Sequence, residues 1–161
     1  MWTLLVGIGA FLGLTSIFEA QLLAVFLGLP AIVLSGLAGR RLGSERLGLF
    51  AAGLTATYAF IWINDGLLVA ETVAVCAAAG AVLVGLRFAS LPNRRNAVLL
   101  GITGGLAALC RAELILYLPI VAGVVLARNP LQWRERLARY SIVGLSALLV
   151  ISPWAVSYTH L

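Results

Sequence analysis

Charged residues are scarce in this chain, and lysine is missing altogether. Only 11% of the 161 residues are charged, whereas 62% are hydrophobic, and the mean hydropathy is +1.07. Soluble domains carry roughly 25% charged and 45–50% apolar residues, and a globule of this size has too little interior to hide the excess. These proportions exclude a soluble enzyme, a disordered regulator and a disulfide-stapled secreted domain. They predict an integral membrane protein.

Metal-binding and nucleophilic side chains are also few. The chain has one histidine and two cysteines, Cys76 and Cys110, which lie in or beside apolar runs. A zinc site needs several such ligands at set spacings, so we predict neither a metal nor another cofactor. The sequence has no Walker-type phosphate loop, no Gly-x-Ser-x-Gly motif and no dinucleotide-binding turn. Nothing in it therefore indicates ATP-driven transport.

What the sequence does have is a series of long apolar runs. At roughly 20 residues per spanning helix, the chain has room for five to seven crossings. We predict an all-α, polytopic transmembrane helical bundle of about six membrane helices. An apolar N-terminal helix, residues 1–18, would either span the membrane or lie along its surface. The predicted spans are residues 22–38, 47–63, 67–86, 96–110, 114–127 and 140–152.

Two of these runs, residues 96–110 and 114–127, are short for a hydrocarbon core of ~30 Å. The polar joint between them, Arg111 to Glu113, would then lie in a thin membrane or below the membrane surface. Charge at that depth is tolerated where it faces protein or water, which predicts a cavity opening outward. Gly101, Gly104 and Gly105 lie just before the joint, and Gly101 and Gly105 have the i, i+4 spacing of closely packed membrane helices.

All eleven basic residues are arginine, and three polar loops, residues 40–46, 87–95 and 128–139, hold ten of them. A formal charge of +5 can indicate a nucleic-acid partner, but short arginine clusters between apolar runs are typical of membrane topology. We predict no nucleic-acid binding. We predict instead that the chain crosses the plasma (inner) membrane several times, with these loops on the cytoplasmic side. The groups expected on the external face are Glu19, Asp65, Arg111, Glu113 and Trp154.

Few polar residues remain at membrane depth, and they form the candidate site: Asn64, Asp65, Glu71, Arg111 and Glu113. Buried carboxylates are costly unless they are paired or solvated. Arg111 is the one cation assigned to their side, so it is their expected partner. Structural alternatives stay open, because Asp65 is also a favoured N-cap for a helix starting at Gly66. The Arg111–Glu113 segment is equally compatible with an ordinary interfacial loop.

The last six residues, 156–161, match the translation of a transposase mosaic-end adapter used in sequencing libraries. Segments of such origin are left out of fold reasoning. We therefore expect residues 1–155 to be a partial transmembrane domain and residues 156–161 to be a tail of adapter origin. The single histidine, His160, falls in that tail and is not part of the candidate site.

Four ordered motifs carry a family resemblance: Gly39-Arg40-Arg41-Leu42-Gly43 with Leu47–Ala52, Asn64–Glu71, Gly104–Glu113, and Ser152-Pro153-Trp154. Together they resemble the GT-C superfamily of integral-membrane glycosyltransferases. The similarity is to the family 39-like branch of protein mannosyltransferases and lipid A aminoarabinose transferases. The chain departs from the family's third motif, because Cys110 and Ala112 stand where Thr and Pro are commoner.

The resemblance implies transfer of a sugar from a polyprenyl-phosphate-linked donor to an acceptor at the bacterial cell envelope. The acceptor, a protein, lipid or glycan, would meet the donor on the external face. Asp65 would orient the acceptor or the base, Arg111 would stabilise the lipid phosphate, and Glu71 and Glu113 would hold Arg111, with Asn64 beside the substrate. The family's main catalytic carboxylate lies upstream of the matching region, so these residues are expected only to support catalysis.

Two other classes of function remain as alternatives. In a polytopic transporter or lipid flippase, buried Glu71 with Arg111 would serve ion or proton coupling. Transporters commonly show internal repeats with matched broken helices, and none is evident in this sequence. A non-catalytic membrane scaffold is the third possibility.

Overall fold

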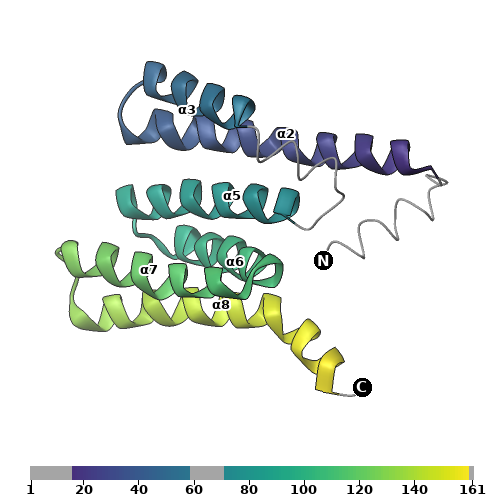
Figure 1. The fold of residues 1–161 in the computed structure, drawn as a ribbon. Helices are drawn as coiled ribbons and strands as arrows, with labels where there is room; N and C mark the ends of the chain where they lie inside the picture. Colours follow the sequence, from purple (N-terminus) through teal and green to yellow (C-terminus); the bar gives the residue numbers. More distant parts are fainter. Residues whose placement is uncertain (1–15, 59–70, 160–161) are drawn as a thin grey trace. The chain divides into compact units, whose positions relative to one another are not determined.

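The computed structural model describes residues 16–58 and 71–159. Within these two stretches every regular element is a helix, which confirms the predicted all-α class (Figure 1). Asn64, Asp65 and most of the apolar segment 1–18 lie outside the described residues. The elements are α2 (Ile17–Leu42), α3 (Glu45–Thr57), α5 (Glu71–Ser90), α6 (Arg94–Cys110), η1 (Ala112–Leu116), α7 (Tyr117–Arg128) and α8 (Trp133–Thr159).

Three helices are long and apolar enough, by length and composition, to cross a membrane. They are Ile17–Leu42, Glu71–Ser90 and the Trp133–Trp154 part of α8. The expected number of six spans is therefore matched only in part. The helices α3, α6 and α7 have 13, 17 and 12 residues. At ~1.5 Å per residue they reach about 18–26 Å, less than the ~30 Å hydrocarbon core.

The chain from residue 128 to 139, predicted as a loop, is mostly helical. α7 ends at Arg128, and α8 already begins at Trp133. The prediction followed the low apolar content, but arginine, leucine, alanine and glutamate are all good helix formers. Glu135 and Arg139 also pair one turn apart, with 3.7 Å between Oε2 and Nη2. The predicted span 140–152 is thus the middle of a 27-residue helix that continues to Thr159.

Polar side chains fix the starts of three helices. Ser16 and Glu19 form a reciprocal capping box at α2. Ser44 accepts from the Leu47 N–H at the start of α3, and Asn93 accepts from an amide in the first turn of α6. Such caps satisfy N–H groups that have no partner inside the helix. The connections at residues 43–44 and 91–93 are short as a result.

The chain divides into two compact units, Met1–Gly80 and Ala81–Leu161. In the first unit, α2 and α3 form an antiparallel pair (Figure 1). Their backbones lie almost in contact: a Cβ on Gly39 would come 2.9 Å from Leu47 O, and one on Gly48 would come 2.8 Å from Gly36 O. The alanines at positions 24, 31 and 38 are buried in α2.

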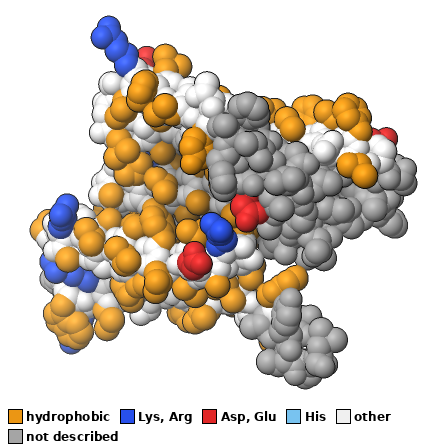
Figure 2. Space-filling model, viewed as in Figure 1, with side chains coloured by type: hydrophobic (Ala, Val, Ile, Leu, Met, Phe, Trp, Pro, Cys, Tyr) orange, Lys and Arg blue, Asp and Glu red, His pale blue; other side chains and the backbone are white. Residues whose placement is uncertain are grey.

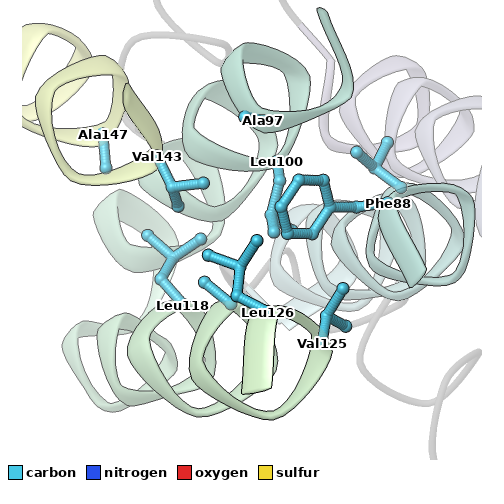
Figure 3. Packing of buried hydrophobic residues seen from close by; sticks show 10 residues of the cluster. Phe88, Ala97, Leu100, Leu118, Val125, Leu126, Val143 and Ala147 are labelled. Carbon is cyan, nitrogen blue, oxygen red and sulfur yellow. The ribbon is translucent and has the colours of Figure 1, made fainter. Parts of the chain in front are cut away.

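The second unit has a core of larger side chains. Phe88 of α5 and Leu100 of α6 are fully buried. Figure 3 shows them pointing toward side chains from α7 and α8. The buried members of this cluster are Val84, Phe88, Ala97, Leu100, Leu118, Ala122, Val125, Leu126, Val143 and Ala147.

Glycines set the distance between α6 and its neighbours, as their spacing predicted. A Cβ on Gly101 would come 2.6 Å from Ser146 Cβ, and one on Gly105 would come 3.1 Å from Ala147 O, both on α8. Gly104 instead faces α7, where an added Cβ would lie 2.6 Å from Leu118 Cγ. The i, i+4 pair therefore packs against α8, and the glycine between them makes room for the core.

Candidate functional site

The structure places three of the five predicted site residues. Arg111 follows the last residue of α6, Glu113 lies in η1, and Glu71 is the first residue of α5. Arg111 and Glu113 share one turn of the second unit, whereas Glu71 belongs to the first. Asn64 and Asp65 fall in the undescribed segment 59–70, so their predicted place beside Arg111 stays a prediction.

The backbone explains why α6 stops before Arg111. Arg111 has an extended conformation, with φ −142° and ψ 115°, so it does not continue the helix. Its N–H still donates to Ala107 O at 2.9 Å, and its carbonyl accepts from Leu114 N–H at 3.0 Å. The chain therefore turns directly from α6 into the 3₁₀ helix η1. The polar joint predicted between the two short runs is confirmed at this position.

Electrostatics favour these charges where they stand. A cation is stabilised at the C-terminal end of a helix, where Arg111 lies, and an anion in a first turn, where Glu71 and Glu113 lie. These positions fit the ordinary interfacial loop that the sequence left open, and they are also compatible with a ligand-binding role. Arg111 and Glu113 are both exposed, so their side chains are accessible from outside the protein.

An apolar hollow of about 260 Å³ lies beside this turn. It is formed by η1, α7 and α8, and neither Arg111 nor Glu113 lines it. This hollow is apolar and suited to hydrocarbon, and the outward-opening cavity expected at Arg111 and Glu113 stays a prediction. Its lining is Ile115, Leu116, Leu118, Pro119, Ala122, Tyr140, Val143, Gly144, Ala147, Leu148 and Ile151.

Tyr117 is a positioning residue that the sequence reasoning missed. Its hydroxyl donates to Ala81 O of α5 at 3.1 Å, which ties the start of α7 to α5. Gly85 makes this possible, because a Cβ there would collide with the Tyr117 hydroxyl. The available signal was a tyrosine placed four residues after the charged turn, in an otherwise apolar run. By fixing the first residue of α7, Tyr117 also restrains η1 and the turn that holds Arg111.

The arginines of the second unit lie at the opposite ends of its helices from Arg111. Arg87 is in the last turn of α5, Arg94 and Arg95 are in the first turn of α6, and Arg128 ends α7. Because successive helices in this unit run in opposite directions, these positions meet at one end (Figure 1). The side of the membrane on which these arginines lie stays a prediction.

No group of three or more potential metal ligands occurs among the described residues. Comparison with protein-family models, with curated proteins and with solved structures finds no match for this chain.

Proposed function

We propose that this chain acts in a polytopic membrane glycosyltransferase of the GT-C type. The enzyme would transfer a sugar from a polyprenyl-phosphate-linked donor to an acceptor on the external face of the plasma membrane. The observation that carries the proposal is the turn after α6. There an exposed arginine, within the motif that resembles the family's third element, stands beside an apolar hollow.

Such a donor has two chemically different parts, and the turn offers a surface for each. The Arg111 guanidinium is a planar fork that stays charged and can donate two parallel hydrogen bonds to phosphate oxygens. The hollow offers the isoprenoid chain a wall of aliphatic side chains. Ile115 and Leu116 connect the two, because both belong to η1 and both line the hollow. A phosphate at Arg111 would therefore have its chain beside hydrocarbon.

The reaction we propose needs a base, an oriented acceptor and a stabilised leaving group. A carboxylate removes the proton of the acceptor hydroxyl, whose oxygen attacks the anomeric carbon of the sugar. The bond from that carbon to the phosphate oxygen breaks, and the lipid phosphate leaves with the electron pair. Arg111 stabilises the leaving phosphate, while Asp65 orients the acceptor or the base. Glu71, Glu113 and Asn64 complete the proposed site by holding Arg111 and the substrate.

The proposed topology has the chain crossing the membrane several times, with the arginine-rich connections on the cytoplasmic side. Three apolar helices support membrane insertion. The remaining crossings would come from the shorter helices α3, α6 and α7. Of these, α7 is extended at its outer end by η1. Arg111 then lies on the external side, where a polyprenyl-linked sugar is presented after export.

Binding of polyprenyl monophosphate to the chain in nanodiscs tests the role of Arg111. Arg111→Ala removes charge-assisted hydrogen bonds of ~1.5–3 kcal/mol, so the affinity should fall about 10- to 100-fold. Arg128→Ala is the matched control, because Arg128 is also an exposed arginine of the second unit but lies at the other end of α7. Unchanged binding by Arg111→Ala, or an equal loss in both variants, would reject the proposed site.

A sugar-transfer assay in membranes tests the catalytic part. Asp65→Ala and Arg111→Ala should each lower the rate of transfer from a polyprenyl-phosphate sugar to the acceptor. Undiminished transfer by both variants would contradict the roles proposed for Asp65 and Arg111. Substrate-dependent movement of ions or lipid across the vesicle membrane, without sugar transfer, would instead favour the transporter or flippase.

A further inference from the structure

The second unit ends in a strongly basic surface, which we call the arginine end. It holds seven arginines and one glutamate, Glu135, for a formal charge of +6. Figure 2 shows blue side chains gathered at the left of the helices α5 to α8. Its arginines are Arg87, Arg94, Arg95, Arg128, Arg134, Arg136 and Arg139.

Two of these arginines bind backbone oxygens, and one of them, Arg139, also pairs with Glu135 at 3.7 Å. Arg139 Nη1 donates to Pro92 O, which joins α8 to the connection between α5 and α6. Arg136 Nη2 donates to Asn129 O at 2.8 Å and closes the connection between α7 and α8. These bonds hold the two connections together but leave the positive charge in place.

The remaining charge is not neutralised by the protein. Within residues 81–159, Arg94, Arg95 and Arg128 are exposed and form no ion pair. The Nε–H groups of Arg87 and Arg136 are buried, and neither has a hydrogen-bond partner in the described chain. Buried guanidinium donors without partners and clustered like charges are both unfavourable. An anion at this surface would relieve that repulsion.

Arg94 and Arg95 are also placed where a positive charge is unfavourable. Both lie in the first turn of α6, which contains no acidic residue. The N-terminal end of a helix carries a partial positive charge that repels a cation. Next to them, Leu91, Pro92, Asn93 and Arg139 line a shallow hollow of about 220 Å³. Arg94 and Arg95 follow Asn93, which lines this recess, directly in the chain, and both are exposed.

Apolar side chains identify the source of the anion. Trp133, Leu137 and Tyr140 follow one another at helical spacing along the start of α8, and they are 68%, 57% and 41% exposed. Exposed tryptophan and tyrosine beside arginine are typical of the depth of lipid headgroups. A soluble anion would leave these apolar side chains in water, whereas a phospholipid contacts them with hydrocarbon and the arginines with phosphate. Arg134 stacks on Trp133, 5.5 Å from the ring centroid, and so brings charge to the same depth.

We infer that the arginine end binds the phosphate headgroups of anionic phospholipids in the leaflet that surrounds it. Arg94 and Arg95 make the main contacts, beside the recess between α5 and α6. Trp133, Leu137 and Tyr140 rest against the upper part of the acyl chains. Its main contacts lie at the other end of the second unit from Arg111, although Tyr140 also lines the apolar hollow. It anchors the unit at a fixed depth and favours membranes rich in acidic lipid.

The experiment uses the full chain in nanodiscs of phosphatidylcholine with phosphatidylglycerol. The relative association of spin-labelled lipids is measured by electron paramagnetic resonance. We expect a clear preference for phosphatidylglycerol that weakens as salt rises. An arginine near an anionic surface contributes about five-fold in affinity, so Arg94→Gln with Arg95→Gln should lower the preference roughly 25-fold. Arg94→Lys with Arg95→Lys keeps the charge and should keep most of the preference.

The matched control is Arg41→Gln with Arg46→Gln. It removes the same charge from two exposed arginines of the first unit, at the connection between α2 and α3. This control should lower the preference much less, because only the arginine end combines its charge with the exposed Trp133, Leu137 and Tyr140. The inference is overturned if the wild-type chain does not distinguish the two lipids, or if both glutamine pairs lose the preference equally. Loss of the preference in the lysine pair would overturn it as well.

Discussion

In the α2–α3 pair, backbone lies against backbone, whereas residues 81–161 enclose large side chains. Gly36, Gly39 and Gly48 bring α2 and α3 together, and the buried Ala24, Ala31 and Ala38 lie in α2. The second unit buries Phe88 and Leu100 completely and uses glycine mainly between α6 and α8. Lipid is as apolar as a leucine side chain, so helices in a membrane associate through close contact rather than through the exclusion of water. The two units achieve that contact in different ways.

Truncating the buried aromatic should have the largest effect. Phe88→Ala leaves a cavity inside the second unit and should lower the free energy of unfolding in detergent by about 3–5 kcal/mol. Phe50→Ala in α3 is the control, because that side chain is 64% exposed, and it should change little. Similar losses for both variants would contradict the claim that the second unit, unlike the α2–α3 pair, depends on a core of large buried side chains.

Adding one methyl group at the α6–α8 contact should have the next largest effect. Gly101→Ala places a Cβ against Val143 O and Ser146 Cβ, where backbone has to move. We expect a loss of about 2–3 kcal/mol in thermal unfolding. Gly144→Ala on α8 is the control, since an added Cβ there meets nothing within 4 Å. A tolerated Gly101→Ala would mean that α6 and α8 do not touch through this glycine.

The same change in the α2–α3 pair tests the other unit. Gly39→Ala brings a Cβ to 2.9 Å from Ala51 Cβ and Leu47 O. The two helices are connected by a short turn and can separate slightly, so we expect a smaller loss of about 1–2 kcal/mol. Gly53→Ala, which has open space around it, is the matched control on α3. Equal stability of these two alanine variants would contradict glycine-mediated packing of the pair.

Removing a single hydroxyl should have the smallest effect. Tyr117→Phe loses the bond to Ala81 O at 3.1 Å, and interhelical hydrogen bonds of this kind contribute about 0.6–1 kcal/mol. Ser90→Ala is the control, because its exposed hydroxyl donates to Leu86 O of its own helix at 3.0 Å. The Tyr117 variant should also bind polyprenyl monophosphate more weakly, since η1 is less well fixed. If Ser90→Ala is the more damaging change, Tyr117 has no positioning role.

Sequence reasoning predicted the features that depend on local chemistry or on simple spacing. The all-α class, the close packing of the glycines in α6 and the break before Arg111 are confirmed. It mistook the helical start of α8 for a loop, because arginine-rich segments look polar while still forming good helices. The core around Phe88 and the bond from Tyr117 to Ala81 were not predicted, since they join residues far apart in the chain. Only the folded topology specifies such pairs.

For the candidate site, the sequence identified the turn from Arg111 to Glu113 but not its surroundings. The apolar hollow is built from η1, α7 and α8, and no local pattern indicates that these helices leave space between them. Glu71 begins a helix in the other compact unit, so its predicted pairing with Arg111 remains to be tested. Asn64 and Asp65 depend on the segment 59–70 and keep the roles that the family resemblance gives them.

The short connection between α2 and α3 also bears on when each contact can form during synthesis. Gly48 follows Gly36 by 12 residues, so the facing surfaces of this pair are complete within about 1–2 s at 5–20 residues per second. Gly101 contacts Ser146, which is 45 residues later in the chain, and synthesis of those residues takes roughly 2–9 s. During that interval the glycine face of α6 is open to other helices in the membrane. Mispairing during biogenesis should therefore concentrate on α6, because the α2–α3 pair completes its facing surfaces within a shorter interval.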